Sequence, residues 1–377
     1  MATHAPLSTT ELRRQNRNRL YRSLTQQWLP ATKQELARRL SMSLPTLTQN
    51  LNELTDMGLI DRSERSSSTG GRRPTLVTPL PNARFALGAE LTGEDLRLAA
   101  VNLRQEVLGY QKLPLPFENT PDYGRRLADL LEAFLDAHQL DRSRLLGVGL
   151  TLPGIISPDQ TAIQYAPTIA IRSTTPFHFL EAIPYPVRLD NDANCGGFGA
   201  WWNREGRQSM AYLSLSWGVG GAFLAHGRLY EGSNHRAAEF GHMCLHPGGR
   251  RCQCGRRGCL EAYCSAARLS DDLGLSLEEF FSALDQGDLN CRQVWERYLR
   301  DLALALTSIH AILDCPVIIG GSVSQYLPPF QGQLEALVEE LDPTVQQGSF
   351  LTLCPNFSRA VCIGAATHFI ADFIRQL

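Results

Sequence analysis

The 377-residue sequence contains no run of about 18 apolar residues, the length that a membrane-crossing helix needs. It also has no apolar segment near its start of the kind that directs a protein to export. We therefore expect no membrane insertion and a cytoplasmic location. Net charge is small as well, because 36 basic side chains face 38 acidic ones. Taken alone, that balance argues against a general binder of nucleic acids or membrane surfaces.

The charge is nevertheless divided unevenly along the chain. The first 80 residues hold 12 basic and 6 acidic side chains, whereas the remainder holds 24 basic and 32 acidic ones. One end of the chain therefore has the charge to meet a polyanion. Since 43% of all residues are hydrophobic, the chain can bury a large core, and its length predicts two or three domains.

Apolar residues recur at helical spacing through residues 9–60, and three helices fit this pattern. The first is predicted over residues 9–27. The second begins after Thr32, where a glutamate three positions later completes a capping box that satisfies free N–H groups. The third begins after Ser43, a second capping residue, and ends at Gly58.

A β-hairpin is predicted to follow these helices. Its strands lie near residues 59–61 and 76–77, and a glycine-rich basic loop at residues 66–74 joins them. The order helix, turn, helix and hairpin is that of a winged helix-turn-helix domain. We place this domain at residues 1–80, because a Leu-Pro-Asn segment then separates it from a new pattern.

The third predicted helix has leucines on one side and small, polar, uncharged residues on the other. In a helix-turn-helix, the second helix enters the major groove, where side-chain amides can read adenine. Arginines of the wing can enter a minor groove or bind phosphates. The candidate DNA-binding residues are Pro45, Thr46, Thr48, Gln49, Asn52, Arg72 and Arg73. The alternative is a three-helix interaction module whose basic excess is a solvated surface.

From residue 85 onward, strand-like segments alternate with helix-like ones, which is typical of an α/β fold. We assign these segments to one larger region over residues 81–377. The strand-like segments are FALGAEL, DLRLAAVNL, VLGYQKLPL, LLGVGLTL, PVRLDND, MAYLSLSWGVGGAFLAHGRLY and PVIIGG. Helices are predicted over residues 121–138, 265–284, 287–313 and 357–376.

Half of the ten cysteines fall within 21 residues, namely Cys244, Cys252, Cys254, Cys259 and Cys264. In a reducing compartment, such clustering favours a metal over disulfides. Glycines on either side of Cys-x-Cys suit a structural, tetrahedral zinc site completed by one imidazole. His242 and His246 are both available for that position. Cys244 or Cys264 could compete as ligands, and the alternative is a set of free, buried cysteines.

Four segments make the sequence similar to the ROK family, named for repressors, open reading frames and kinases. They are GGRRP at residues 70–74, NDAN at 191–194, EFGH at 239–242 and CxCGxxGCLE at 252–261. The resemblance covers nearly the whole chain. It implies an actin-like, hexokinase-type fold in which two α/β lobes surround a sugar cleft. It also implies a structural zinc ion bound by His242, Cys252, Cys254 and Cys259.

The same resemblance implies a sugar site. Members of the family contact sugar hydroxyls through side chains that match Asn191, Asp192, Glu239, His242 and Glu261. In kinase members, the aspartate matching Asp192 removes the proton from the attacking sugar hydroxyl. If one ring nitrogen of His242 binds zinc, only the other can face the sugar. The alternative is that these polar residues only cap strands and helices.

The sequence departs from the kinase pattern where ATP phosphates should bind. ROK kinases carry Asp-x-Gly-Gly-Thr at the first strand turn, whereas this chain has ELTGED at residues 90–95. Glu94 and Asp95 then stand where phosphate should approach. Like charges about 4 Å apart cost on the order of 4 kcal/mol at an effective dielectric constant near 20. We therefore expect nucleotide binding to be lost, with no catalytic residue and Asp192 as a vestigial base. The glycines of residues 216–221 and 320–321 are interpreted as structural turns.

Together these patterns predict a DNA-binding transcription regulator of carbohydrate metabolism genes, with repression as the expected mode and a sugar as effector. A homodimer or tetramer is expected, because one helix-turn-helix makes too few base contacts to specify a double-stranded operator. One alternative is an active ATP-dependent sugar kinase with a DNA-binding head. Another is a regulator controlled by a protein partner.

Overall fold

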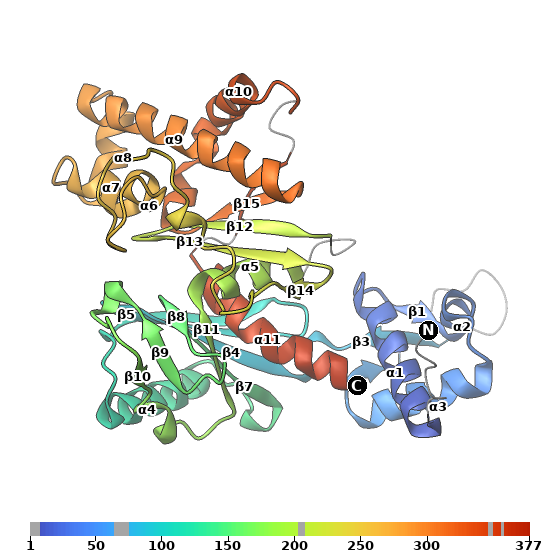
Figure 1. Cartoon of the computed structure of the whole chain (residues 1–377). Helices are drawn as coiled ribbons and strands as arrows, with labels where there is room; N and C mark the ends of the chain where they lie inside the picture. Colours follow the sequence, from blue (N-terminus) through green and yellow to red (C-terminus); the bar gives the residue numbers. More distant parts are fainter. Residues whose placement is uncertain (1–7, 64–74, 203–207, 346–349, 356–357) are drawn as a thin grey trace.

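The structure, a computed structural model, describes residues 8–63, 75–202, 208–345, 350–355 and 358–377. In Figure 1, a small N-terminal module lies beside two larger lobes, and the red helix α11 (Ala360–Gln376) extends from between the lobes toward that module. The N-terminal winged helix-turn-helix and the two-lobed α/β region are the predicted fold class. Within the described residues, no helix combines the length and apolar character needed to cross a membrane.

The N-terminal module forms as its capping residues predict. Helix α1 (Thr9–Thr25) precedes α2 (Lys33–Leu40), and the Thr32 hydroxyl accepts the N–H of Glu35 in a complete capping box. Helix α3 (Leu44–Asp56) begins after Ser43, whose hydroxyl accepts the N–H of Thr46. Leucines of all three helices are buried in a common core, among them Leu20, Leu36, Leu47, Leu51 and Leu54.

The wing is a three-stranded antiparallel sheet. Strands β2 (Ile60–Asp61) and β3 (Leu76–Pro79) form the predicted hairpin. A further strand, β1 (Ala31–Thr32), pairs with the other edge of β3 and was not predicted from the sequence. A strand of two residues is too short to show alternating apolar and polar positions. Only its pairing with β3 identifies it as a strand.

The first lobe contains a five-stranded sheet in the order β11-β7-β4-β5-β6. Its strands are β4 (Phe85–Leu91), β5 (Asp95–Asn102), β6 (Val107–Pro114), β7 (Leu145–Leu152) and β11 (Val187–Asn191). Helix α4 (Pro121–Ala137) packs on one face, and α11 packs on the other. A small sheet, made of β8 (Ile155–Ile156), β9 (Ala162–Tyr165) and β10 (Thr175–Pro176), extends this lobe.

The second lobe also contains a five-stranded sheet, in the order β14-β13-β12-β15-β16. Its strands are β12 (Met210–Leu215), β13 (Val219–Ala225), β14 (Arg228–Leu229), β15 (Val317–Gly320) and β16 (Leu351–Leu353). The long helix α9 (Leu289–Leu313) packs on one face. Around it lie α6 (Glu261–Cys264), α7 (Ala266–Asp271), α8 (Leu277–Asp285) and α10 (Gln331–Leu341).

The prediction of one continuous helix over residues 265–284 was wrong, because α7 and α8 are separate helices. Residues 272–276, which include Gly274, connect the two helices.

The φ angle of Gly274 is +66°, in the left-handed region that glycine adopts without strain, and the chain turns there between α7 and α8.

Helices α5 (Asp192–Trp202) and α10 were not predicted. Helix α5 contains three glycines, which obscure its helical pattern. All three are needed for close packing: Gly199 faces α11, where a Cβ would lie 2.8 Å from the Cα of Gly364, and Gly196 and Gly197 face Tyr212 of β12.

Candidate functional site

A cavity of about 660 Å³ lies where the two lobes meet. The first lobe contributes Gly154 and Tyr165 to its wall, and the second contributes Ser214 and Ser216. The cavity brings together all five predicted sugar-binding residues: Asn191, Asp192, Glu239, His242 and Glu261. Residues far apart in the sequence therefore share one polar pocket, of a size that suits a small ligand.

Asn191 and Asp192 enter this cavity from the junction of β11 and α5. The Asn191 amide donates to the carbonyl of Gly154 at 2.8 Å, and its oxygen accepts the N–H of Ala193 at 2.8 Å. Asn191 therefore caps α5 and fixes the cavity wall, which is the structural role considered as the alternative. Burial raises the pKa of the Asp192 carboxyl to about 6.

The other three residues of the set come from the second lobe. Glu239 and His242 border a short 3-10 helix (Phe240–His242), and Glu261 begins α6. One oxygen of Glu261 accepts the N–H of Val219 at 3.1 Å, and the other accepts the thiol of Cys252 at 3.3 Å. Glu261 thus connects the cysteine loop to the hairpin that lines the cavity. Burial raises the pKa of Glu239, and the nearby carboxylate of Glu261 raises it further.

The predicted zinc ligands also meet in space. One ligand atom from each of His242, Cys252, Cys254 and Cys259 lies within 4.8 Å of all the others. The sulfur atoms of Cys254 and Cys259 are 3.8 Å apart, and Nδ1 of His242 is 3.8 Å from the sulfur of Cys252. Tetrahedral zinc with bonds of about 2.3 Å to sulfur separates two sulfurs by about 3.8 Å. The donor set therefore fits a zinc ion.

The competing ligands are engaged elsewhere. His246 bonds through Nε2 to the carboxylate of Asp301 at 2.7 Å. Cys244 is exposed, and its sulfur lies 3.9 Å from the carbonyl of Arg257. Cys264 is fully buried beneath α9, with its thiol directed at the carbonyl of Tyr298. The histidine and the three cysteines that the resemblance implied are thus the ones that cluster.

Two arginines of the cavity were missed by the sequence analysis. Arg236 and Arg256 line it, and their positive charges oppose the rise in the pKa of Glu239. Gln253 adds an amide from the cysteine loop. No local pattern marks Arg236, and Arg256 lies between Cys254 and Cys259, where the cysteines dominate the interpretation. Their place in the cavity follows only from the fold of the loops.

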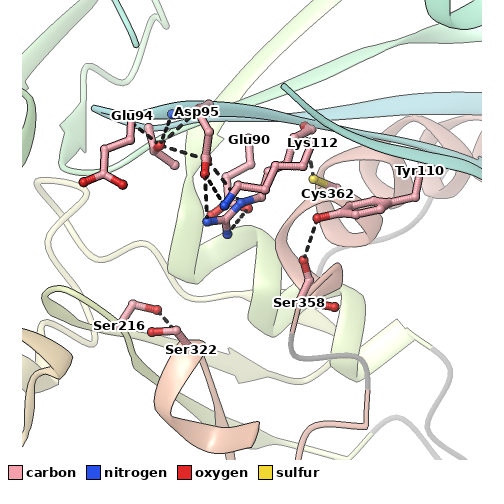
Figure 2. Close-up of polar contacts among 11 residues, drawn as sticks. Glu90, Glu94, Asp95, Tyr110, Lys112, Ser216, Ser322, Ser358 and Cys362 are labelled. Atoms are coloured by element: carbon pink, nitrogen blue, oxygen red, sulfur yellow. Dashed lines mark hydrogen bonds and ion pairs between the residues drawn. The ribbon is translucent and has the colours of Figure 1, made fainter. Parts of the chain in front are cut away.

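The turn between β4 and β5 carries the segment that the ROK resemblance matched to the kinase phosphate loop (Figure 2). Asp95 is buried there, and its carboxylate pairs with Lys112 at 2.8 Å and with Arg97 at 3.2 Å. These contacts outweigh burial and lower the pKa of Asp95. The expectation that Asp95 would repel phosphate as a free charge is therefore corrected, because two cations compensate it. Glu94 is exposed and points away from this network (Figure 2).

The same turn uses its own N–H groups internally. The hydroxyl of Thr92 accepts the N–H of Glu94 at 3.2 Å and the N–H of Asp95 at 2.9 Å. Nearby, Glu90 forms an ion pair with Arg97 at 3.3 Å, and burial raises its pKa to about 7. Three backbone donors of this turn, the N–H groups of Thr92, Glu94 and Asp95, are therefore already paired.

The two later glycine segments lie at turns of the second lobe, and their interpretation as purely structural stays a prediction. The first is the hairpin between β12 and β13, whose exposed tip carries Trp217. The second follows β15, where Gly321 has a φ of 85° and the N–H of Ser322 donates to the Ser216 hydroxyl at 3.2 Å. Figure 2 shows this serine pair apart from the network around Asp95.

In the N-terminal module, α3 exposes Pro45, Gln49 and Asn52. The Asn52 oxygen accepts a hydrogen bond from Arg62 at 2.7 Å. Arg62 follows β2 and was not among the predicted DNA-binding residues, although its place beside the wing could have suggested it. This contact puts a positive charge next to the amides of the exposed face.

The remaining predicted DNA-binding residues differ in how far the structure describes them. Thr46 and Thr48 are half-buried, and their hydroxyls bond to Ser43 and to the carbonyl of Leu44. Both hydroxyls therefore serve the first turn of α3. Arg72 and Arg73 lie outside the described residues, and their role stays a prediction.

Both the N-terminal module and the two-lobed region are similar to known proteins. A model of the ROK family matches residues 86–358, and a model described as winged helix-turn-helix DNA-binding matches residues 30–61. A glucokinase from Halalkalibacterium halodurans is 31% identical over 286 residues, which cover 67% of this chain and 86% of that protein. The DNA-binding transcriptional dual regulator NagC of Escherichia coli is 25% identical over 385 residues, which cover 92% of this chain and 94% of that protein.

Among solved structures, a ROK family transcriptional regulator described as a homologue of the Escherichia coli MLC protein has a TM-score of 0.76 at 23% identity. The match covers 97% of both chains, so the helix-turn-helix and both lobes are part of the shared fold. Since the ROK family model spans most of the sequence, the chain belongs to the ROK family.

Proposed function

We propose that this protein is a sugar-responsive transcription regulator, with repression as its mode of action. The observation that carries the proposal is that one chain combines a winged helix-turn-helix with the cavity that contains the five predicted sugar-binding residues. In addition, the turn between β4 and β5 bonds N–H groups of its own backbone to the hydroxyl of Thr92. NagC, which aligns over nearly the full length, is a DNA-binding regulator by name. The division into residues 1–80 for DNA and residues 81–377 for the effector is part of this proposal.

The cavity supports a polyhydroxylated ligand. Carboxylates and amides can match the hydroxyl pattern of a sugar, which an apolar pocket cannot do. Asp192, Glu239 and Glu261 offer acceptors, and the half of the His242 ring that faces away from the cysteines offers a further polar atom. Asn191 acts by holding the wall in place. This assignment of the five residues to sugar binding rests on their common cavity and on the resemblance.

A zinc ion bound by His242, Cys252, Cys254 and Cys259 would serve a structural role, because four protein ligands leave no open coordination position. When bound, it would balance two of the three thiolate charges and cross-link the loop. Nδ1 of His242 faces Cys252, so zinc would fix the orientation of the imidazole that borders the cavity. Glu261 would keep its bond to Val219 and so join the loop to the cavity wall.

Contacts between the lobes and the N-terminal module support a route for the signal. Helix α11 packs on α5, where Asp192 is the first residue, and its other end contacts α1. The Asn18 amide donates to the carbonyl of Ile374 in that contact. A sugar that changes the lobe arrangement would thus move α11 against the DNA-binding module. Two modules in a homodimer or tetramer would then change their spacing on an operator.

The second candidate function is an active sugar kinase, which the glucokinase relative and the retained Asp192 favour. Against it stands the turn at Thr92, whose hydroxyl already takes two N–H groups. A coupled assay with ATP and a panel of hexoses, amino sugars and pentoses separates the two. We expect no turnover above background. Turnover that disappears in Asp192→Asn would establish the kinase instead.

The regulator is tested by measuring operator-fragment binding with and without each sugar of the panel, together with calorimetry on the protein alone. We expect one class of sugar to release heat on binding and to change DNA affinity. Coupling between two sites commonly amounts to about 1–3 kcal/mol, which corresponds to roughly 5- to 150-fold in affinity. DNA binding without a response to any sugar would favour control by a protein partner.

A further inference from the structure

We infer a second metal site, separate from the cysteine loop, formed by Asp190, Cys195 and His368 at the junction of the lobes. These residues come from β11, α5 and α11. One ligand atom from each lies within 4.8 Å of the other two. The site would take a divalent ion that accepts sulfur, nitrogen and oxygen ligands together, for which Zn²⁺ is the natural choice.

Cys195 and His368 are buried, and one ring nitrogen of His368 has no hydrogen-bond partner among the described residues. His368 is 3% exposed and Cys195 is 1% exposed. Nε2 of His368 lies 3.5 Å from a carboxylate oxygen of Asp190, yet it makes no hydrogen bond within the described residues. A buried polar atom without a partner destabilises the folded state. A metal ion between these atoms would supply the missing partner.

The first contacts around the cluster orient its members. One oxygen of Asp190 accepts the N–H of Asn191 at 2.8 Å and the amide of Asn194 at 2.9 Å, which leaves its other oxygen facing His368. The imidazole of His368 stacks on the ring of Phe198, with centroids 4.2 Å apart and planes within 6°. Both the carboxylate and the imidazole are thus held in fixed orientations before any ion arrives.

Charge and access also suit a divalent cation. Metal binding forms a metal–sulfur bond as the Cys195 thiol releases its proton to water. The thiolate and the Asp190 carboxylate then balance two positive charges, and neutral His368 needs no deprotonation. Asp190 also lines a small cavity of about 140 Å³, which brings the carboxylate end of the cluster next to an open space.

The position of the site would allow a bound ion to hold helices α5 and α11 together where the lobes meet. Helices α5 and α11 approach so closely that a Cβ on Gly364 would lie 1.7 Å from the carbonyl oxygen of Cys195. Cys195 lies one helical turn after Asp192 of the sugar-type cavity. A bound ion would therefore clamp α11 to the helix that begins in the cavity. It would lower the freedom of the lobes to rotate about this contact.

Metal analysis of the full-length protein tests the site. The purified chain is equilibrated with excess Zn²⁺, freed of loosely bound ion by gel filtration, and measured for zinc per chain. We expect two ions in the unmodified protein, and one each in Cys195→Ala and His368→Gln. The control variant Cys315→Ala removes a buried cysteine outside both clusters and should keep two.

Cobalt provides a second readout that does not depend on stability. Co²⁺ bound to a thiolate absorbs by charge transfer, and Cys195→Ala should lose the share of that absorption contributed by one sulfur, while far-ultraviolet circular dichroism stays unchanged. The inference is overturned if the unmodified chain binds one zinc ion, or if Cys195→Ala and His368→Gln bind as many ions as it does. Loss of the loop zinc in Cys254→Ser leaves the second site loaded.

Discussion

The guanidinium of Arg17 on α1 donates to a main-chain oxygen of Leu377, just beyond α11, at 2.6 Å. The same guanidinium pairs with Glu53 of α3 at 2.7 Å. One side chain therefore joins the end of the lobe-spanning helix to the helix that would enter DNA. A shift of α11 along its axis would therefore be transmitted through Arg17 to α3.

We predict that Arg17→Ala weakens communication between sugar and DNA. The variant should still bind the operator fragment alone and the sugar alone. The change in DNA affinity that the sugar causes should, however, fall several-fold. Fluorescence anisotropy with and without sugar measures this ratio. Arg13→Ala is the matched control, because it removes a positive charge from the exposed side of α1. Equal losses of the ratio in both variants would contradict the role of Arg17.

A second prediction concerns base recognition by α3. Gln49→Ala should relax base preference at one position of each half-site and cost about 1–3 kcal/mol of specific binding. Arg62→Ala, and likewise Arg72→Ala and Arg73→Ala, should weaken binding to most sequences and flatten its salt dependence. Affinity for specific and random duplexes over a salt series tests both. An identical loss on the two duplexes for Gln49→Ala would argue against base reading.

A third prediction concerns the cysteine loop. Cys254→Ser should release the loop zinc and lower the free energy of unfolding of the second lobe by several kcal/mol, because binding of a structural metal is coupled to folding. Denaturant unfolding and zinc analysis measure the two effects. Cys244→Ser changes an exposed cysteine outside the cluster and should alter neither. Unchanged zinc content in Cys254→Ser would remove this residue from the site.

Local signals in the sequence predicted the parts of the fold that depend on neighbouring residues. The helix starts after Thr32 and Ser43 are of this kind, because a capping hydroxyl bonds to an N–H three residues away. The ROK resemblance supplied the five cavity residues, which no spacing rule would have collected. It could do so because each lies in a short segment of fixed sequence.

Contacts between distant segments could not be read in this way. Lys112 reaches Asp95 because β6 pairs with β5 in a register that sets Arg97 opposite Lys112. That register turned an expected free charge into a compensated one. Helix α5 was missed for a related reason, since its glycines reflect close packing against α11 and the second-lobe sheet and not a local turn.

The last prediction uses the buried carboxyl of Glu90. Burial raises its pKa from 4.5 to about 7, while Arg97 opposes the rise and Asp192 and Asp95 add to it. The folded state therefore binds this proton more tightly than the unfolded state. The resulting stabilisation is fully present below pH 4.5 and is lost as pH rises through 7. A shift of this size corresponds to about 3 kcal/mol.

We therefore expect the unmodified protein to lose free energy of unfolding between about pH 5 and pH 8, and Glu90→Gln to lose less over the same interval, because glutamine resembles the protonated acid. The difference between the two curves isolates Glu90 from Asp192, whose raised pKa acts in both proteins. Urea unfolding at a series of pH values measures it. Glu94→Gln, at an exposed position of the same turn, should run parallel to the unmodified protein. If Glu90→Gln also runs parallel, Glu90 is ionised in the folded state throughout this range, because its ion pair with Arg97 then outweighs burial.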